Sequence, residues 1–178
     1  MAQEVRRLRE PRSAQWLSDR TRKLGYCVTR SVIADLENGR RRYVTTAELC
    51  VLAWALKVPP IQLLYPDLPD GTVEIVPDVD KPSIEAVMWF SGELAYGHVE
   101  DEPAEFQAVE QGRELVKLSR ERLTLESQIS TLSDLIGRFK EQSQRQPFIG
   151  QIESAQTRID AINERLHQIE GAVVDDAR

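Results

Sequence analysis

Hydrophobic residues in the first 65 positions recur at helical spacing in short runs, and each run is bounded by a capping or breaking residue. Serine and threonine favour helix starts, glycine favours helix ends, and proline suits a first turn. The pattern predicts five short helices. They run from Ala2 to Arg9, from Ser13 to near Gly25, from Thr29 to Asn38-Gly39, from Thr45 through Leu56, and from Pro59-Pro60 to near Leu64. Thr45 and Glu48 have the spacing of a capping box.

The apolar sides of these helices are expected to form one core. The residues expected to be largely buried are Trp16, Ile33, Leu36, Leu49, Leu52 and Leu56. The following stretch, 66–82, is rich in proline, which forbids a continuous helix. Within it, Thr72 to Val76 alternates and is β-branched, which indicates one short strand or an extended linker. Ser83 then caps a short apolar helix that ends near Gly92.

Two heptad patterns follow Pro103, which is placed to begin a helix. The first pattern comprises Leu115, Leu118, Leu125, Ile129, Leu132, Ile136 and Phe139, with Arg122 as its one polar member. The second comprises Ile152, Ala155, Ile159, Ile162, Leu166, Ile169 and Val173. Gln146-Pro147 separates them, so we expect an antiparallel coiled-coil hairpin with arms of about 40 and about 25 residues.

The unequal arms have a consequence for oligomeric state. The shorter arm cannot cover the longer one, so Leu115, Leu118 and Leu123 are expected to be exposed unless something else packs there. A second copy of the chain would cover them, which favours a homodimer. Trp89 and Phe90 are the other candidates, in a monomer whose hairpin folds back on residues 83–97.

Charge is distributed unevenly along the chain, whose net charge is -6. Residues 1–65 hold 12 Lys/Arg and 6 Asp/Glu, whereas residues 66–178 hold 11 Lys/Arg and 23 Asp/Glu. A basic end on an acidic chain indicates a local module that binds a polyanion. No apolar run is long enough to span a membrane, and the N-terminus lacks a signal-peptide core, so a cytoplasmic protein is expected.

Residues with catalytic or metal-binding chemistry form no recognisable pattern. Cys27 and Cys50 are far apart and have no flanking histidine, and the HExxH, CxxC, GxSxG and GxxxxGK[ST] motifs are missing from the sequence. The sequence therefore predicts a protein that is not an enzyme and needs no metal or cofactor.

The segment VTRSVIADLENGRRR, followed by VTTAELCVLAWALKVPPIQLLYP, resembles the Xre-type (lambda-repressor-like) helix-turn-helix regulators over roughly residues 3–66. The downstream segment VEIVPDVDKPSIEAVMWFSGE resembles regulators of actinobacteria and their mobile elements. The resemblance implies a mainly α chain in three parts. These are a five-helix lambda-repressor-like DNA-binding domain (1–66), a linker with a short strand and a short helix (67–102), and the coiled-coil hairpin as an oligomerisation region (103–178).

One departure from the family concerns the connection between its second and third helices, which is usually a tight turn. Here Leu17 lies twelve residues before Thr29, so either the second helix or the turn is longer than usual.

The resemblance also implies which residues contact DNA, because the start of the third helix enters the major groove. Thr29 would hold the helix start and reach a phosphate, while Arg30 and Ser31 would face base edges. Asp35 would accept a hydrogen bond from a cytosine amine or orient Arg30. The residues expected over the sugar-phosphate backbone are Asn38, Arg40, Arg41 and Arg42.

Two functions are therefore open. The first is a sequence-specific transcriptional regulator, most simply a dimeric repressor that binds double-stranded DNA on the nucleoid. The second is a protein-interaction adaptor or antitoxin-like regulator that works through residues 103–178 and no longer reads DNA. The basic charge of residues 1–65 favours the first.

Overall fold

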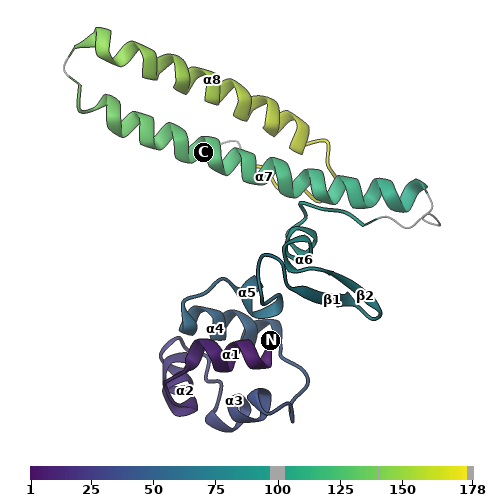
Figure 1. Cartoon of the computed structure of the whole chain (residues 1–178). Helices are drawn as coiled ribbons and strands as arrows, with labels where there is room; N and C mark the ends of the chain where they lie inside the picture. The colour runs from purple at the N-terminus through teal and green to yellow at the C-terminus, as the bar shows by residue number, and fades with distance from the viewer. Residues whose placement is uncertain (97–102, 140, 176–178) are drawn as a thin grey trace. The chain divides into compact units, whose positions relative to one another are not determined.

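The computed structural model describes residues 1–96, 103–139 and 141–175, and the chain divides into two compact units, Met1–Met88 and Trp89–Arg178. The described residues are mainly helical, as predicted (Figure 1). The helices are α1 (Ala2–Arg9), α2 (Ala14–Lys23), α3 (Arg30–Glu37), α4 (Thr46–Leu56), α5 (Pro60–Leu64), α6 (Ser83–Phe90), α7 (Pro103–Ile136) and α8 (Gln142–Leu166), and the strands are β1 (Thr72–Val76) and β2 (Val79–Pro82). Residues 97–102 of the predicted linker and 176–178 of the predicted oligomerisation region lie outside the described residues. The predicted division into three parts stays a prediction.

The helix starts predicted from the sequence are present in the first unit. Ser13 Oγ accepts a hydrogen bond from the Trp16 amide at 3.1 Å. Thr45 and Glu48 form the predicted capping box at the start of α4. Such caps satisfy amide groups that have no partner within the helix, which is why these helices begin where they do.

The core of this unit contains three of the six residues predicted to fill it, namely Ile33, Leu36 and Leu52. The other three are half-buried and pack against the margin of this core: Trp16, Leu49 and Leu56. On α2 it is the next residue, Leu17, that is fully buried. The guanidinium groups of Arg12 and Arg20 stand 4.4 and 5.0 Å from the centre of the half-buried Trp16 ring.

Thr72 to Val76 forms a strand, which was one of the two predictions for this segment, the other being an extended linker. It pairs antiparallel with a second strand, Val79–Pro82, that the sequence analysis did not predict. The two-residue connection places Asp78 in the left-handed region, with φ of 65°. Ser83 begins α6, as expected, and its buried hydroxyl donates a hydrogen bond to the Pro66 carbonyl at 2.6 Å. This bond ties the hairpin of strands to the end of the five-helix segment.

The second unit contains a packed pair of antiparallel helices, α7 and α8, as predicted. The connection between them lies at residues 137–141, so the break predicted at Gln146-Pro147 was wrong. Pro147 instead lies inside α8. The Phe139 and Phe148 rings stack with their centres 5.5 Å apart, and Arg145 Nε donates to the Phe139 carbonyl at 2.8 Å. These contacts close the connection earlier and leave helices of 34 and 25 residues.

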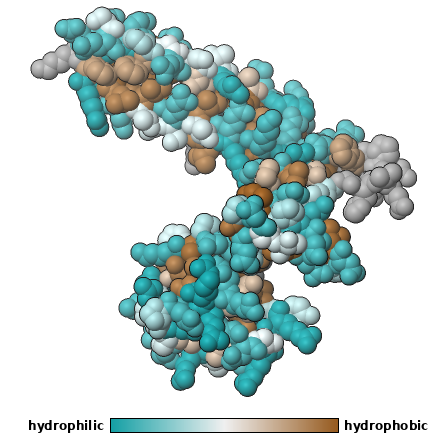
Figure 2. Space-filling model, viewed as in Figure 1, coloured by the Kyte–Doolittle hydropathy of each residue, from teal (hydrophilic) through white to brown (hydrophobic). Residues whose placement is uncertain are grey.

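The predicted heptad positions supply most of the contact between the two helices. Those buried on the second arm are Ala155, Ile159, Ile162, Leu166 and Ile169. Val173 was assigned wrongly, because it is 97% exposed. Figure 2 shows hydrophobic side chains gathered at the end of the helix pair where the chain turns (upper left).

The early part of α7 is covered by this chain itself, so the predicted exposure of Leu115 and Leu118 was wrong. Both pack against the cluster of Ile162, Leu166 and Ile169. The residues that follow α8 extend the cover, since Ala172 and Val174 join the same cluster and Arg122 donates to the Asp175 carbonyl at 2.8 Å. The exposed Leu123 agrees with the prediction.

Candidate nucleic-acid interface

The first turn of α3 presents three of the predicted DNA-contacting residues to solvent. Thr29 Oγ1 accepts a hydrogen bond from the Val32 amide at 3.3 Å and lies 2.9 Å from Ser31 Oγ. Arg30 is exposed and forms no hydrogen bond or ion pair with the described part of the chain. The cap therefore fixes the helix start, while the Arg30 guanidinium stays available to a ligand.

Helix α3 is held firmly beneath this exposed turn. Its inner side chains Ile33 and Leu36 are buried in the core. At its other end, Arg9 of α1 binds Glu37 through two contacts of 2.7 Å each. The hydrogen bonds to Glu37 hold the pKa of Arg9 above its ordinary value. A helix anchored at both its face and its end can place side chains reproducibly on a partner.

The sequence left open whether the second helix or the turn after it is longer than usual, and the connection between α2 and α3 decides this. Helix α2 ends at Lys23, and a six-residue turn, 24–29, leads to α3. Thr21 is fully buried, and its Oγ1 accepts a hydrogen bond from the Val28 amide at 3.0 Å while donating to the Ser18 carbonyl at 2.8 Å. The turn is therefore longer than the usual tight one, and a buried hydroxyl fixes its final part.

Arg41, one of the residues predicted to lie over the sugar-phosphate backbone of DNA, forms an ion pair within the chain. Its guanidinium binds Glu48 through two contacts, of 2.8 and 3.0 Å. Glu48 also accepts a hydrogen bond from the Thr45 amide at 2.9 Å. Burial opposes ionisation of Glu48, but the bonds from Arg41 and Thr45 outweigh it and hold its pKa below the ordinary value. Arg41 therefore ties the loop after α3 to the start of α4.

The other residues predicted to contact the sugar-phosphate backbone of DNA lie around the end of α3. Asn38 is its exposed C-terminal cap, and Arg42 is exposed without a hydrogen bond or ion pair among the described residues. Asp35 forms a long ion pair with Arg40, at 3.8 Å, and not with Arg30. Tyr43, which the sequence analysis did not single out, is 83% exposed beside the arginine run. An aromatic residue following three arginines was the available signal.

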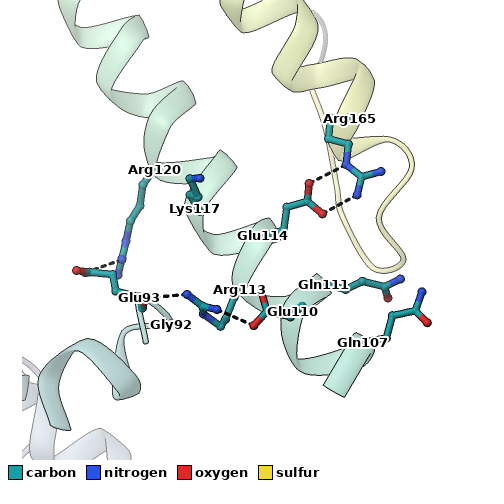
Figure 3. A pocket seen from close by; sticks show the side chains of 10 residues that line it. All are labelled: Gly92, Glu93, Gln107, Glu110, Gln111, Arg113, Glu114, Lys117, Arg120 and Arg165. Atoms are coloured by element: carbon teal, nitrogen blue, oxygen red, sulfur yellow. Dashed lines mark hydrogen bonds and ion pairs between the residues drawn. The ribbon is translucent and has the colours of Figure 1, made fainter. Parts of the chain in front are cut away.

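A pocket of about 680 Å³ lies in the second unit (Figure 3). Three ion pairs line it, Glu93–Arg120 (2.8 Å), Arg113–Glu110 (2.6 Å) and Arg165–Glu114 (2.7 Å). Each of these arginines already has a carboxylate partner, so the network joins neighbouring segments, and Lys117 is the lining cation that has no ion pair with a described residue. The described residues hold no group of three His, Cys, Asp or Glu side chains arranged to bind a metal ion.

Comparison with protein-family models, curated proteins and solved structures finds no match for this chain. Within the described ranges, none of the helices combines the length and the apolar character needed to cross a membrane. The candidate interface is therefore a capped, anchored helix start with exposed polar side chains in the basic part of the chain.

Proposed function

We propose that this chain is a sequence-specific DNA-binding transcriptional regulator of the Xre type, with α3 as the helix that enters the major groove. The observation that carries the proposal is the exposed first turn of α3, where Thr29, Arg30 and Ser31 project from a helix anchored by the core. This turn lies within residues 1–65, which hold 12 Lys/Arg against 6 Asp/Glu. Positive charge gives affinity for DNA, and side chains in the groove give sequence preference.

Each exposed residue of this turn has a role in the proposal. The Arg30 guanidinium donates two hydrogen bonds to O6 and N7 of a guanine, the commonest base-specific contact. Ser31 reads an adjacent base edge with less discrimination, and the Thr29 hydroxyl contacts a phosphate. The residues proposed to contact the sugar-phosphate backbone are now Asn38, Arg40, Arg42 and Tyr43, because Arg41 is engaged by Glu48.

Dimerisation through the helix pair completes the proposal. Phe106, Val109 and Leu123 are exposed hydrophobic residues of α7, and their spacing places them on one side of that helix. Burying these side chains against a second copy would remove apolar surface from water. A two-fold dimer would then read two half-sites about 34–36 Å apart. A dimer bound at a promoter excludes polymerase, so repression is the simplest regulatory outcome.

The same exposed side of α7 favours the alternative, in which the helix pair binds another protein and the first unit does not read DNA. The two functions differ in how binding to random duplex DNA responds to salt. Each phosphate contact contributes a slope of about -0.9 to the dependence of log affinity on log salt concentration.

Fluorescence anisotropy on a random duplex across a salt series tests DNA binding directly. We expect steep weakening with salt, and Arg42→Ala should reduce the slope by about 1. Arg6→Ala removes one exposed charge from α1, outside the proposed interface, and serves as the matched control. Salt-insensitive or absent binding of the intact chain would favour the adaptor function instead.

A further inference from the structure

Helix α4 has more apolar surface than its own core uses. Its sequence, TAELCVLAWAL, is apolar on nearly every side, and helices of this kind are usually buried all round. Leu52, Ala53 and Ala55 are buried in the core of the first unit. Trp54, however, is 74% exposed. A tryptophan held in solvent on a well-packed helix points to a surface that binds a partner.

Trp54 lines a groove of about 610 Å³ between the ends of α2 and α4, entirely within the first unit. Five lining residues are apolar and three are basic: Leu24, Ala53, Trp54, Ala55 and Val58, with Arg20, Lys23 and Lys57. The groove is built and not merely a gap, because Arg20 Nε donates to the Ala55 carbonyl at 2.9 Å. That bond holds one wall in place.

The charge around the groove is of one sign, since no acidic residue in the described part of the chain lines it. Lys23 and Lys57 are exposed and form no hydrogen bond or ion pair through their side chains with the described residues. Lys57 adopts the left-handed conformation, with φ of 62°, at the end of α4. Glycine fits such a position more easily, so the lysine supplies a charge where the backbone disfavours any side chain.

We propose that this groove binds an acidic segment of a partner protein. A bulky apolar side chain of that segment packs over Trp54 and Leu24, and its carboxylates face the basic residues at the groove edge. DNA fits the groove poorly, because its phosphates would leave the apolar lining uncovered. None of the lining residues belongs to the proposed DNA interface, so this inference does not depend on the DNA-binding function.

Selection of displayed random peptides on the intact chain tests the groove without assuming a partner. We expect enrichment of sequences that combine Asp or Glu with Leu, Phe or Ile. Trp54→Ala should weaken the selected peptides about 30-fold or more, as for a central aromatic residue of an interface. The double reversal Lys23→Glu with Lys57→Glu should weaken them about tenfold. Arg6→Glu, the matched reversal outside the groove, should leave their affinity unchanged.

Tryptophan fluorescence locates the binding event. The selected peptide should shift the emission of the intact chain to shorter wavelength as Trp54 becomes buried, and Trp54→Phe should abolish the shift while peptide still binds. The proposal is overturned if no peptides that combine acidic and apolar residues are enriched. It is also overturned if Trp54→Ala and the double reversal of Lys23 and Lys57 leave the affinity of the selected peptides unchanged. It is equally overturned if duplex DNA produces the Trp54 shift, or if concentrating the protein alone does so, since the occupant would then be DNA or a second copy.

Discussion

Arg9 and Glu37 join α1 to the end of α3 through two contacts of 2.7 Å, with side chains that are only 11% and 8% exposed. The two residues are 28 positions apart in the sequence. It fixes the end of α3 that is opposite to the exposed turn carrying Arg30. The direction in which α3 presents that turn therefore depends on a nearly buried ion pair as well as on the apolar core.

Glu37→Gln should lower the free energy of unfolding by about 3 kcal/mol, because it leaves the Arg9 guanidinium nearly buried without a charged partner. Urea unfolding, analysed by linear extrapolation, measures the change. Glu10→Gln is the control, since it removes a carboxylate from an exposed pair with Arg6 and should cost less than about 1 kcal/mol. Equal costs for the two substitutions would mean that the buried pair does not hold α3.

Thr21→Val should destabilise the first unit by about 1–3 kcal/mol, although valine has nearly the same shape. The substitution removes the Oγ1 that pairs with the Val28 amide and leaves that buried donor unsatisfied. Thr21→Ser keeps the hydroxyl and should retain most of the stability, apart from the loss of one methyl group. Thermal or urea unfolding of both variants measures the two changes in stability. A Thr21→Val variant as stable as Thr21→Ser would contradict a stabilising role of the hydroxyl.

Stability should fall in acid partly through Glu48. Its pKa in the folded chain lies below the ordinary value of 4.5, so its ionised form stabilises the fold. That contribution is fully present above about pH 4.5 and is lost as pH falls through the folded pKa. Glu48→Gln should be less stable at neutral pH and should lose less stability on acidification. Unfolding free energies measured along a pH series provide the test, and parallel curves for the two proteins would contradict it.

Local signals explain why the helix boundaries of the first unit could be predicted. Ser13, Thr29 and Thr45 each satisfy amides at a helix start, and that chemistry depends only on neighbouring residues. The apolar periodicity likewise predicted burial of Ile33 and Leu52. Such features need no knowledge of which elements meet in space.

The errors arose where distant residues decide the structure. The sequence analysis did not foresee that Glu48 binds Arg41, because a side chain seven residues away cannot be recognised as its partner from composition. Leu115 and Leu118 were expected to be exposed because the second arm was taken as too short to cover the first, but both pack against the cluster that ends it. Pro147 was taken as a helix break, although contacts of Phe139 close the turn earlier.

Sedimentation tests dimerisation through the helix pair. We expect the intact chain to sediment as a dimer at micromolar concentration, and a chain ending at Glu102 to be monomeric. Leu123→Glu should shift the intact chain toward monomer, because it places a charge on the exposed side of α7. A dimer that survives removal of residues 103–178 would place the interface elsewhere, and a monomeric intact chain would reject dimerisation.

The central claim, that α3 reads DNA sequence, is tested most directly by one comparison of affinities. Randomised duplexes bound by the intact chain are selected and sequenced, and the affinity of Arg30→Ala is measured for the selected site and for random duplex. The account predicts a loss of about 1–3 kcal/mol on the selected site and little change on random DNA. Failure to enrich any site, or equal losses on both duplexes, would contradict it.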